Sequence, residues 1–203
     1  MIKIIRPQKP TFLELNAEQW NNDYVRTLAE NPRYRFSWRT YEGKPVNKHL
    51  EPILLEMTKN HCAFCDCHEL GADIKPTVEH FCPKSKSKFP HLAYEWTNLF
   101  PACHYCQEKL DVFDELLLKP DDEDYDFYRY FYFDDATGKL EPNPQATPKD
   151  QTRAQTTIRL YRLNGSERRK IKEKRLTWVK RFRAGLVETD KIDDYPYRYL
   201  YSV

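Results

Sequence analysis

Two cysteine pairs constrain this chain more than any other feature of its sequence. Cys62 and Cys65 form one Cys-x-x-Cys turn, and Cys103 and Cys106 form a second that begins 38 positions after Cys65. Each turn supplies two thiolates, and two such turns together match the tetrahedral, four-sulfur coordination of zinc. Because four sulfurs leave no open position for a substrate, we expect this zinc to stabilise the fold and to take no part in catalysis.

Alternative ligands and a redox role remain open from the sequence. Other thiols and imidazoles near the pairs could each replace one ligand: Cys67, Cys82, His61, His68 and His104. A Cys-x-x-Cys motif also occurs in thiol oxidoreductases. We favour a metal because the first ten residues, MIKIIRPQKP, carry no apolar export signal, which predicts a reducing, cytoplasmic location.

Composition excludes several other classes of protein. No apolar run in the 203 residues approaches the ~18 needed for a membrane-spanning helix. The five glycines lie at least 20 residues apart, so neither common glycine-rich nucleotide loop is present. Aromatic residues make up 14% of the chain, which favours a packed core over disorder. We therefore expect a folded, non-membrane protein that does not itself carry such a loop.

Charge is strongly segregated along the chain, although the net charge is only +2. Residues 111–135 hold ten acids against two bases, whereas residues 153–187 hold twelve bases against two acids. A basic segment of this kind suits an anionic partner. A solvated helix face that simply carries many charges is the alternative interpretation.

Hydrophobic periodicity predicts an α+β fold that is mainly helical. Helices are expected over 17–30 after Asn16 as N-cap, 45–59, 103–118, 150–163, and 166–185 after Ser166 as N-cap. The segment 74–84 indicates a short irregular strand. The aromatic segment 126–144, with Gly138 in its turn, predicts a β-hairpin that ends at its prolines.

The residues between and just after the cysteine pairs are candidates for chemistry. Glu79 precedes His80 shortly before Pro83, Asn98 leads into the second pair, and Gln107 follows it. A lone Glu-His pair is most often structural. Its combination with two flanking cysteine pairs is much rarer.

In these residues the chain resembles the zinc-braced HNH endonucleases, over about 50 residues. The matching elements are Cys62 and Cys65, Glu79-His80 with Pro83, Asn98-Leu99, and Cys103 and Cys106 with Gln107. The resemblance implies a ββα-metal nuclease core over 61–119. An N-terminal helical extension, 1–60, would pack on it, and 120–203 would form an aromatic hairpin plus basic C-terminal helices.

Shorter motifs resemble one branch of this superfamily, the HNH subunit of Septu-type anti-phage defence systems (PtuB-like proteins). They are MIKIIRP, YRFSW, TGKLEPN and TIRLYRLN. The resemblance implies a nuclease that cleaves invading phage or plasmid DNA and assembles with an ATPase of the ABC or SMC type (PtuA-like). Cleavage of RNA remains open, because no motif here reads a base edge or a 2′-hydroxyl.

The resemblance also assigns roles within the core. It makes His80 the general base and Glu79 a ligand of a catalytic Mg²⁺ or Mn²⁺, and it has Asn98 brace the loop that carries His80. Gln107 departs from the pattern, which has Asn or His at this metal-binding place, and Leu110 stands where a basic residue is usual, with Lys109 one step early. Asp111, on the same face of the expected helix, could supply the missing carboxylate.

Two further interpretations complete the sequence analysis. Lys84, Lys86 and Lys88 alternate with serines and would share one side of an extended segment, where they could contact phosphates. The departure at Gln107 leaves a second function open: a catalytically decayed zinc-ribbon adaptor that binds nucleic acid or the ATPase.

Overall fold

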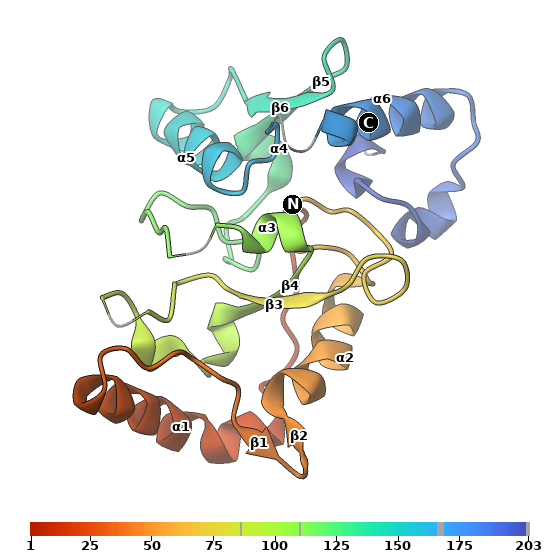
Figure 1. Ribbon diagram of the computed structural model, residues 1–203. Coiled ribbons are helices and arrows are strands. Elements are labelled where there is room, and N and C mark those ends of the chain that lie inside the picture. The colour runs from red at the N-terminus through yellow and green to blue at the C-terminus, as the bar shows by residue number, and fades with distance from the viewer. Residues whose placement is uncertain (86, 110, 166–168, 202–203) are drawn as a thin grey trace.

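The computed structural model describes residues 1–85, 87–109, 111–165 and 169–201 (Figure 1). Lys86, Leu110 and the expected N-cap Ser166 lie outside the described residues. The fold is α+β, as predicted, and the strands of the described part pair into two-stranded antiparallel sheets.

The N-terminal part consists of α1 (Thr11–Glu30), the short strands β1 (Thr40–Tyr41) and β2 (Lys44–Pro45), and α2 (Val46–Thr58). The helix expected from residue 17 starts six residues earlier, so the N-cap prediction for Asn16 is wrong. Pro10 is extended and its carbonyl accepts the first helical hydrogen bonds from Leu13 and Glu14. Asn16 instead donates its side-chain amide to the Phe12 carbonyl inside the helix.

A central hairpin separates two hydrophobic clusters. Strand β3 (Thr77–His80) pairs antiparallel with β4 (Leu99–Ala102), with the short helices η1 (Pro90–Leu92) and η2 (Trp96–Asn98) between them. Glu79 faces Phe100 and His80 faces Leu99 across the ladder. Phe100 belongs to the cluster that includes the cysteines, and Leu99 belongs to the cluster under α1 and α2. Because successive strand residues alternate sides, Glu79 and His80 point toward different clusters.

The helix expected over 103–118 is wrong in length. Helix α3 covers only His104–Gln107, and Glu108 already departs from helical geometry. The buried ammonium of Lys109 contacts the carbonyls of His80, Phe81 and Val112, which requires the chain to fold back here. Further on, the Asp114 carboxylate accepts the Leu116 N–H, a local turn that competes with helix.

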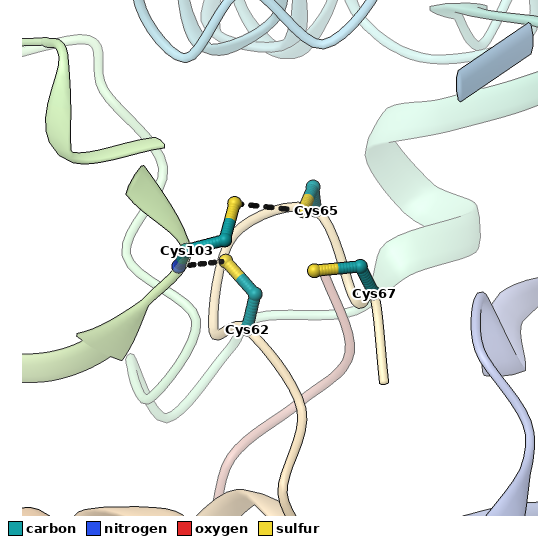
Figure 2. Close-up of side chains that lie close together, drawn as sticks. All are labelled: Cys62, Cys65, Cys67 and Cys103. Atoms are coloured by element: carbon teal, nitrogen blue, oxygen red, sulfur yellow. Dashed lines mark hydrogen bonds between the residues drawn. The ribbon is translucent and has the colours of Figure 1, made fainter. Parts of the chain in front are cut away.

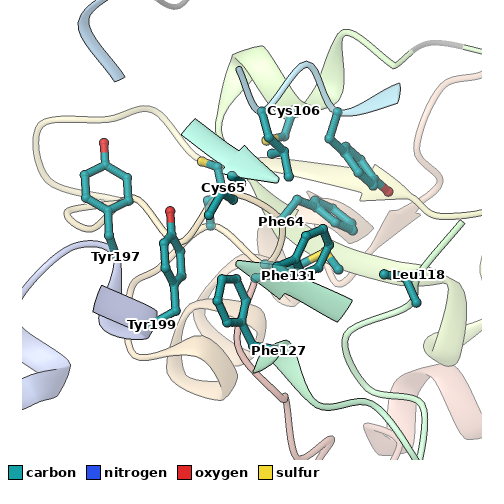
Figure 3. Packing of buried hydrophobic residues seen from close by; sticks show 14 of the residues in the cluster. Phe64, Cys65, Cys106, Leu118, Phe127, Phe131, Tyr197 and Tyr199 are labelled. Carbon is teal, nitrogen blue, oxygen red and sulfur yellow. The ribbon is translucent and has the colours of Figure 1, made fainter. Parts of the chain in front are cut away.

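The C-terminal part packs against the cysteine region. It contains α4 (Phe127–Tyr130), β5 (Phe131–Asp134), β6 (Lys139–Pro142), α5 (Pro148–Leu160), α6 (Arg169–Arg183), η4 (Thr189–Asp194) and η5 (Arg198–Leu200). The predicted aromatic hairpin is confirmed as β5–β6. Figure 3 shows Phe127 and Tyr199 side by side, and their rings stack with centroids 4.5 Å apart. None of the described helices combines the length and apolar character that crossing a bilayer requires.

Candidate metal centre and catalytic cleft

Four cysteine sulfurs converge at one point of the fold (Figure 2). The Sγ atoms of Cys62, Cys65, Cys67 and Cys103 all lie within 4.8 Å of one another. Those of Cys65 and Cys103 are 3.7 Å apart. Tetrahedral zinc with Zn–S bonds of about 2.3 Å separates its sulfurs by ~3.8 Å. The cluster is therefore positioned to bind a metal such as zinc.

The membership of this cluster differs from the sequence prediction at one place. Cys67, which the sequence offered only as a substitute, belongs to it because the loop folds back at Asp66, whose φ of 57° is left-handed. The Cys62 N–H then donates to the Cys67 carbonyl at 2.9 Å and closes the loop. Cys106 lies outside the group of four, but it is buried and its thiol interacts with three of the cluster's sulfurs.

The thiols of this cluster are arranged to hold a cation. Hydrogen bonds from neighbouring thiols, Cys106 foremost, lower the pKa of Cys103 to about 5. Hydrogen bonds from Cys103 and its neighbours likewise lower the pKa of Cys65 well below its ordinary value. Thiolates are the form of cysteine that binds metals. The pKa values of the other two thiols shift the opposite way: burial raises that of Cys62, and the hydrogen bond with Cys103 raises that of Cys67. Two sulfurs of the cluster thus favour the thiolate, and a bound metal would have to displace the protons of the other two.

A second site is lined in part by residues of α3. An open cleft of about 700 Å³ is lined by five of the residues that the sequence singled out, together with others from β3 and α3. The five are Glu79, His80, Lys84, Gln107 and Asp111. The fold thus brings together residues that are more than 30 positions apart in the sequence.

The two ring nitrogens of His80 have partners of opposite kind. Its Nε2 lies 2.9 Å from the Ala93 carbonyl, which can only accept a hydrogen bond, so Nε2 carries the proton. Its Nδ1 lies 3.3 Å from the ammonium of Lys84, which can only donate. Burial, with the Lys84 charge as a smaller cause, holds the pKa of His80 well below 6.5. The imidazole is therefore neutral at pH 7, with its lone pair on Nδ1.

Two aromatic side chains fix the His80 ring. Trp38 stacks on it with centroids 5.4 Å apart and planes at 21°, and Phe36 meets it edge-on at 5.6 Å. The Lys84 ammonium lies 4.8 Å from the centre of the Phe36 ring. The sequence analysis missed Phe36 and Trp38 as site residues. The available signal was the alternation of Tyr34, Phe36 and Trp38 with polar residues, which places the three rings on one side of an extended segment.

Asn98 holds the loop that follows His80. Its side-chain oxygen accepts the Cys82 N–H at 2.7 Å, and its amide donates to the carbonyls of Cys82 and Leu92 at 3.0 and 2.9 Å. These are backbone hydrogen bonds of the kind that the resemblance led us to expect. Their consequence for catalysis stays a prediction.

Glu79 is engaged by a buried lysine that the sequence analysis gave no role. The Glu79 Oε1 atom lies 3.2 Å from the Lys109 ammonium in an ion pair that lacks a well-directed hydrogen bond. Both side chains are almost fully buried. Burial raises the pKa of Glu79 to about 7, and the charge of Lys109 limits the rise.

Gln107 and Asp111 are exposed and line the same cleft as Glu79. The expected helical spacing between them is wrong, because α3 ends at Gln107. Among the described residues, a group of at least three Cys, His, Asp or Glu side chains close enough to share an ion is found at the cysteine cluster and not at this cleft. A catalytic metal would therefore have few protein ligands here. That fits Mg²⁺, which keeps several waters and is commonly held by one or two carboxylates together with substrate phosphate.

Two of the three candidate phosphate-binding lysines, Lys84 and Lys88, are described, and they lie in different surroundings. Lys84 lies in the cleft beside His80, whereas Lys88 is exposed and outside the cleft lining. The Lys88 N–H donates to the Ser85 carbonyl, so this segment turns and is not extended as expected. Lys86 falls outside the described residues.

Comparison with known proteins gives one distant relative and no family model that matches the chain. The chain is 29% identical to the Septu protein PtuB of Bacillus thuringiensis over 114 residues, which is 56% of this chain. The match spans only 38% of the length of that protein. The likeness is therefore a distant homology over part of each chain.

Proposed function

We propose that this chain is a nuclease that hydrolyses phosphodiester bonds of invading DNA as part of a Septu-type anti-phage defence complex. The observation that carries the proposal is His80, a neutral imidazole that lines the cleft and whose Nδ1 lies 3.3 Å from the ammonium of Lys84, another lining residue. The distant homology to a Septu protein supports the biological setting.

Hydrolysis of a phosphodiester needs a base for the attacking water and positive charge for the phosphate. In this proposal the Lys84 ammonium moves from Nδ1 of His80 to the substrate phosphate, and Nδ1 then takes a proton from water as the water oxygen bonds to phosphorus and the P–O bond to the leaving group breaks. The ammonium of Lys84, next to Nδ1, contacts a nonbridging phosphate oxygen. Asn98, Phe36 and Trp38 hold the loop and the ring in place.

The residues at the cleft also fit a hard divalent ion. Carboxylate and amide oxygens of Glu79, Asp111 and Gln107 are the donors that Mg²⁺ or Mn²⁺ prefers, and all three residues line the cleft. When bound, such an ion would supply positive charge for a nonbridging phosphate oxygen. Glu79 would have to exchange its Lys109 partner for the ion, since its carboxylate is buried against that lysine.

The decisive experiment is cleavage of supercoiled plasmid by the purified chain, alone and with its partner, in Mg²⁺ or Mn²⁺. We expect His80→Ala to abolish nicking and His91→Ala, a change at an exposed histidine outside the cleft, to leave it unaffected. Equal activity of His80→Ala and the unaltered protein would refute the role of His80. An RNA substrate in parallel identifies the target, because DNA and RNA share the scissile linkage.

The proposed partner is an ATPase of the ABC or SMC type (PtuA-like). The support is the distant Septu homology, together with a glycine distribution that leaves no room for a glycine-rich nucleotide loop in this chain. Co-purification of the two proteins, with nicking that depends on ATP, tests this assignment.

The second candidate function is an adaptor that binds nucleic acid or the ATPase without cleaving. Two observations favour it: Glu79 is already in an ion pair with Lys109, and Gln107 stands at the last ligand position. An adaptor would bind nucleic acid or the ATPase with no divalent-dependent nicking in any of the assays above.

A further inference from the structure

The segment 33–39, here called the strap, lies between α1 and β1 and packs on His80 through Phe36 and Trp38. Figure 1 shows it running beside the loop that follows β3. It is irregular in structure, but it is anchored at both ends: the Tyr34 N–H donates to the Asn31 carbonyl at 2.9 Å, and the Arg39 N–H donates to the Tyr94 hydroxyl at 3.0 Å. The strap therefore has a defined position relative to His80.

The two sides of the strap differ in character. Phe36 and Trp38 are half-buried and pack on His80, as described above. Arg33 and Arg35, which alternate with the rings, are exposed. In the part of the chain that the structure describes, neither of these two arginines forms an ion pair, whereas Arg39 pairs with Asp23 at 3.2 Å. The strap thus holds two unpaired cations at the surface close to the cleft.

The cleft continues along the strap. A second hollow of about 430 Å³ is lined by Tyr34, Arg35 and Phe36 of the strap, with residues of α1 and of the loop after β3. Lys84 and Asp111 line both this hollow and the His80 cleft, so the two adjoin. The ammonium of Lys84 lies at the junction, 3.3 Å from His80. A strand with its scissile phosphate at His80 would meet Lys84 first and Arg35 next.

Basic residues interleaved with exposed aromatic rings are the usual means of holding a nucleic acid strand without reading its sequence. Tyr34 keeps 38% of its surface exposed beside Arg35 and is available for stacking on a base. We propose that the strap binds the sugar-phosphate backbone of the substrate strand, with Arg35 holding a phosphate next to the one at His80 and Lys84. This inference rests on the proposed function, since the scissile phosphate at His80 sets the path of the strand.

The test compares Arg35→Ala with Arg26→Ala. Arg26 is an exposed arginine on α1 that lines neither hollow, so both variants remove one surface charge. Binding of a fluorescein-labelled single-stranded DNA oligonucleotide, and of the RNA of the same sequence, is measured by anisotropy without added divalent ions over a series of salt concentrations. Cleavage is therefore not needed for the readout.

We expect Arg35→Ala to weaken binding about 5-fold at low salt and to reduce the slope of log Kd against log[salt] by about 0.7, the value of one lost phosphate contact on a single strand. Arg26→Ala should keep the slope of the unaltered protein. Where the protein cleaves, Arg35→Ala should raise KM and leave kcat unchanged.

The outcomes separate the two proposals. An unchanged slope and affinity for Arg35→Ala, or no binding of either oligonucleotide by the unaltered protein, overturns the strap proposal. Binding that depends on Arg35 in a protein that never cleaves supports the strap and overturns the nuclease. Because Arg35 is exposed, we expect equal thermal unfolding of both variants and the unaltered protein, so that the binding differences are not due to loss of fold.

Discussion

The ammonium of Lys109 lies 3.2 Å from the Glu79 carboxylate inside the protein, where that lysine also contacts three backbone carbonyls. Two of the carbonyls lie at the end of β3 and just after it, at His80 and Phe81, and the third is that of Val112, beyond α3. Lys109 therefore links the end of β3 to the chain that follows α3. Removing one member of a buried pair usually costs more than the pair contributes, because the other charge stays buried and unpaired. The pair is therefore a structural link as well as a constraint on Glu79.

The first prediction concerns the pH dependence of stability. The pKa of Glu79 rises from 4.5 to about 7 in the folded protein. A carboxyl group whose pKa is higher in the folded than in the unfolded protein favours the folded state at pH values below the unfolded pKa, and this contribution is lost as the pH rises through the folded pKa. We expect the free energy of unfolding to fall by about 3 kcal/mol because of Glu79 as the pH rises from about 4.5 to above 7, from ~1.4 kcal/mol per pKa unit.

Glu79→Gln should remove this pH dependence, while it leaves the buried Lys109 ammonium without its charged partner and so lowers the free energy of unfolding by an amount that does not follow the Glu79 titration. The measurement is the free energy of unfolding in urea at several pH values, without added Mg²⁺. The difference between the two proteins isolates Glu79, because both share the cysteine cluster and its own pH dependence. A difference that is constant from pH 4.5 to 7.5 would contradict the raised pKa.

The second prediction concerns the pH dependence of activity. The pKa of His80 is held well below 6.5 by burial and by Lys84. A base with a lowered pKa stays unprotonated as pH falls, so we expect kcat to be maintained from pH 7.5 to 6.5 at saturating Mg²⁺, which would keep Glu79 ionised. Lys84→Gln removes the smaller cause and should move the acidic limb of the kcat profile to higher pH, with a higher KM from the lost phosphate contact. An acidic limb at the same pH in both proteins would show that Lys84 does not act on His80.

Part of this fold followed from local patterns in the sequence. The aromatic alternation before Gly138 predicts the β5–β6 hairpin because strand and turn signals lie within a few residues of one another. The periodicity of 45–59 likewise predicts α2 to within two residues at each end. The cysteine spacing predicts a metal cluster and three of the four sulfurs that meet.

Other features depend on contacts between residues far apart in the chain, which periodicity does not encode. Trp38 and His80 are 42 positions apart, and only the fold brings their rings together. The apolar residues after Gln107 favour a helix locally, but the buried Lys109 and its carbonyl partners end it after one turn. Cys67 joins the cluster through the left-handed turn at Asp66, which a search for paired Cys-x-x-Cys motifs does not detect.

The third prediction tests Trp38 as a positioning residue. Its ring covers one face of His80, so Trp38→Ala should let the imidazole leave its orientation and lower kcat about 10- to 100-fold, with little change in KM. Trp38→Phe keeps an aromatic face and should restore most of the rate. Single-turnover cleavage at saturating DNA measures the effect. Equal rates for the Ala variant and the unaltered protein would show that stacking does not position His80.

The fourth prediction concerns the metal cluster. Cys103 belongs to both the observed and the sequence-predicted set of ligands, so Cys103→Ser should lose the zinc that we expect at about one per chain. Because structural zinc contributes directly to folding, this variant should unfold at least about 10 °C lower. Cys82→Ser is the matched control, since Cys82 lies outside the cluster and its hydrogen bonds to Asn98 are made by its backbone.

Elemental analysis of two further variants identifies the fourth ligand. The observed geometry predicts that Cys67→Ser loses more zinc than Cys106→Ser, because Cys67 belongs to the group of four whose sulfurs all lie within 4.8 Å of one another. The opposite order would restore the pairing expected from the two Cys-x-x-Cys motifs and leave Cys67 as a neighbouring thiol. Full zinc content in Cys103→Ser would contradict a thiolate metal site at this position altogether.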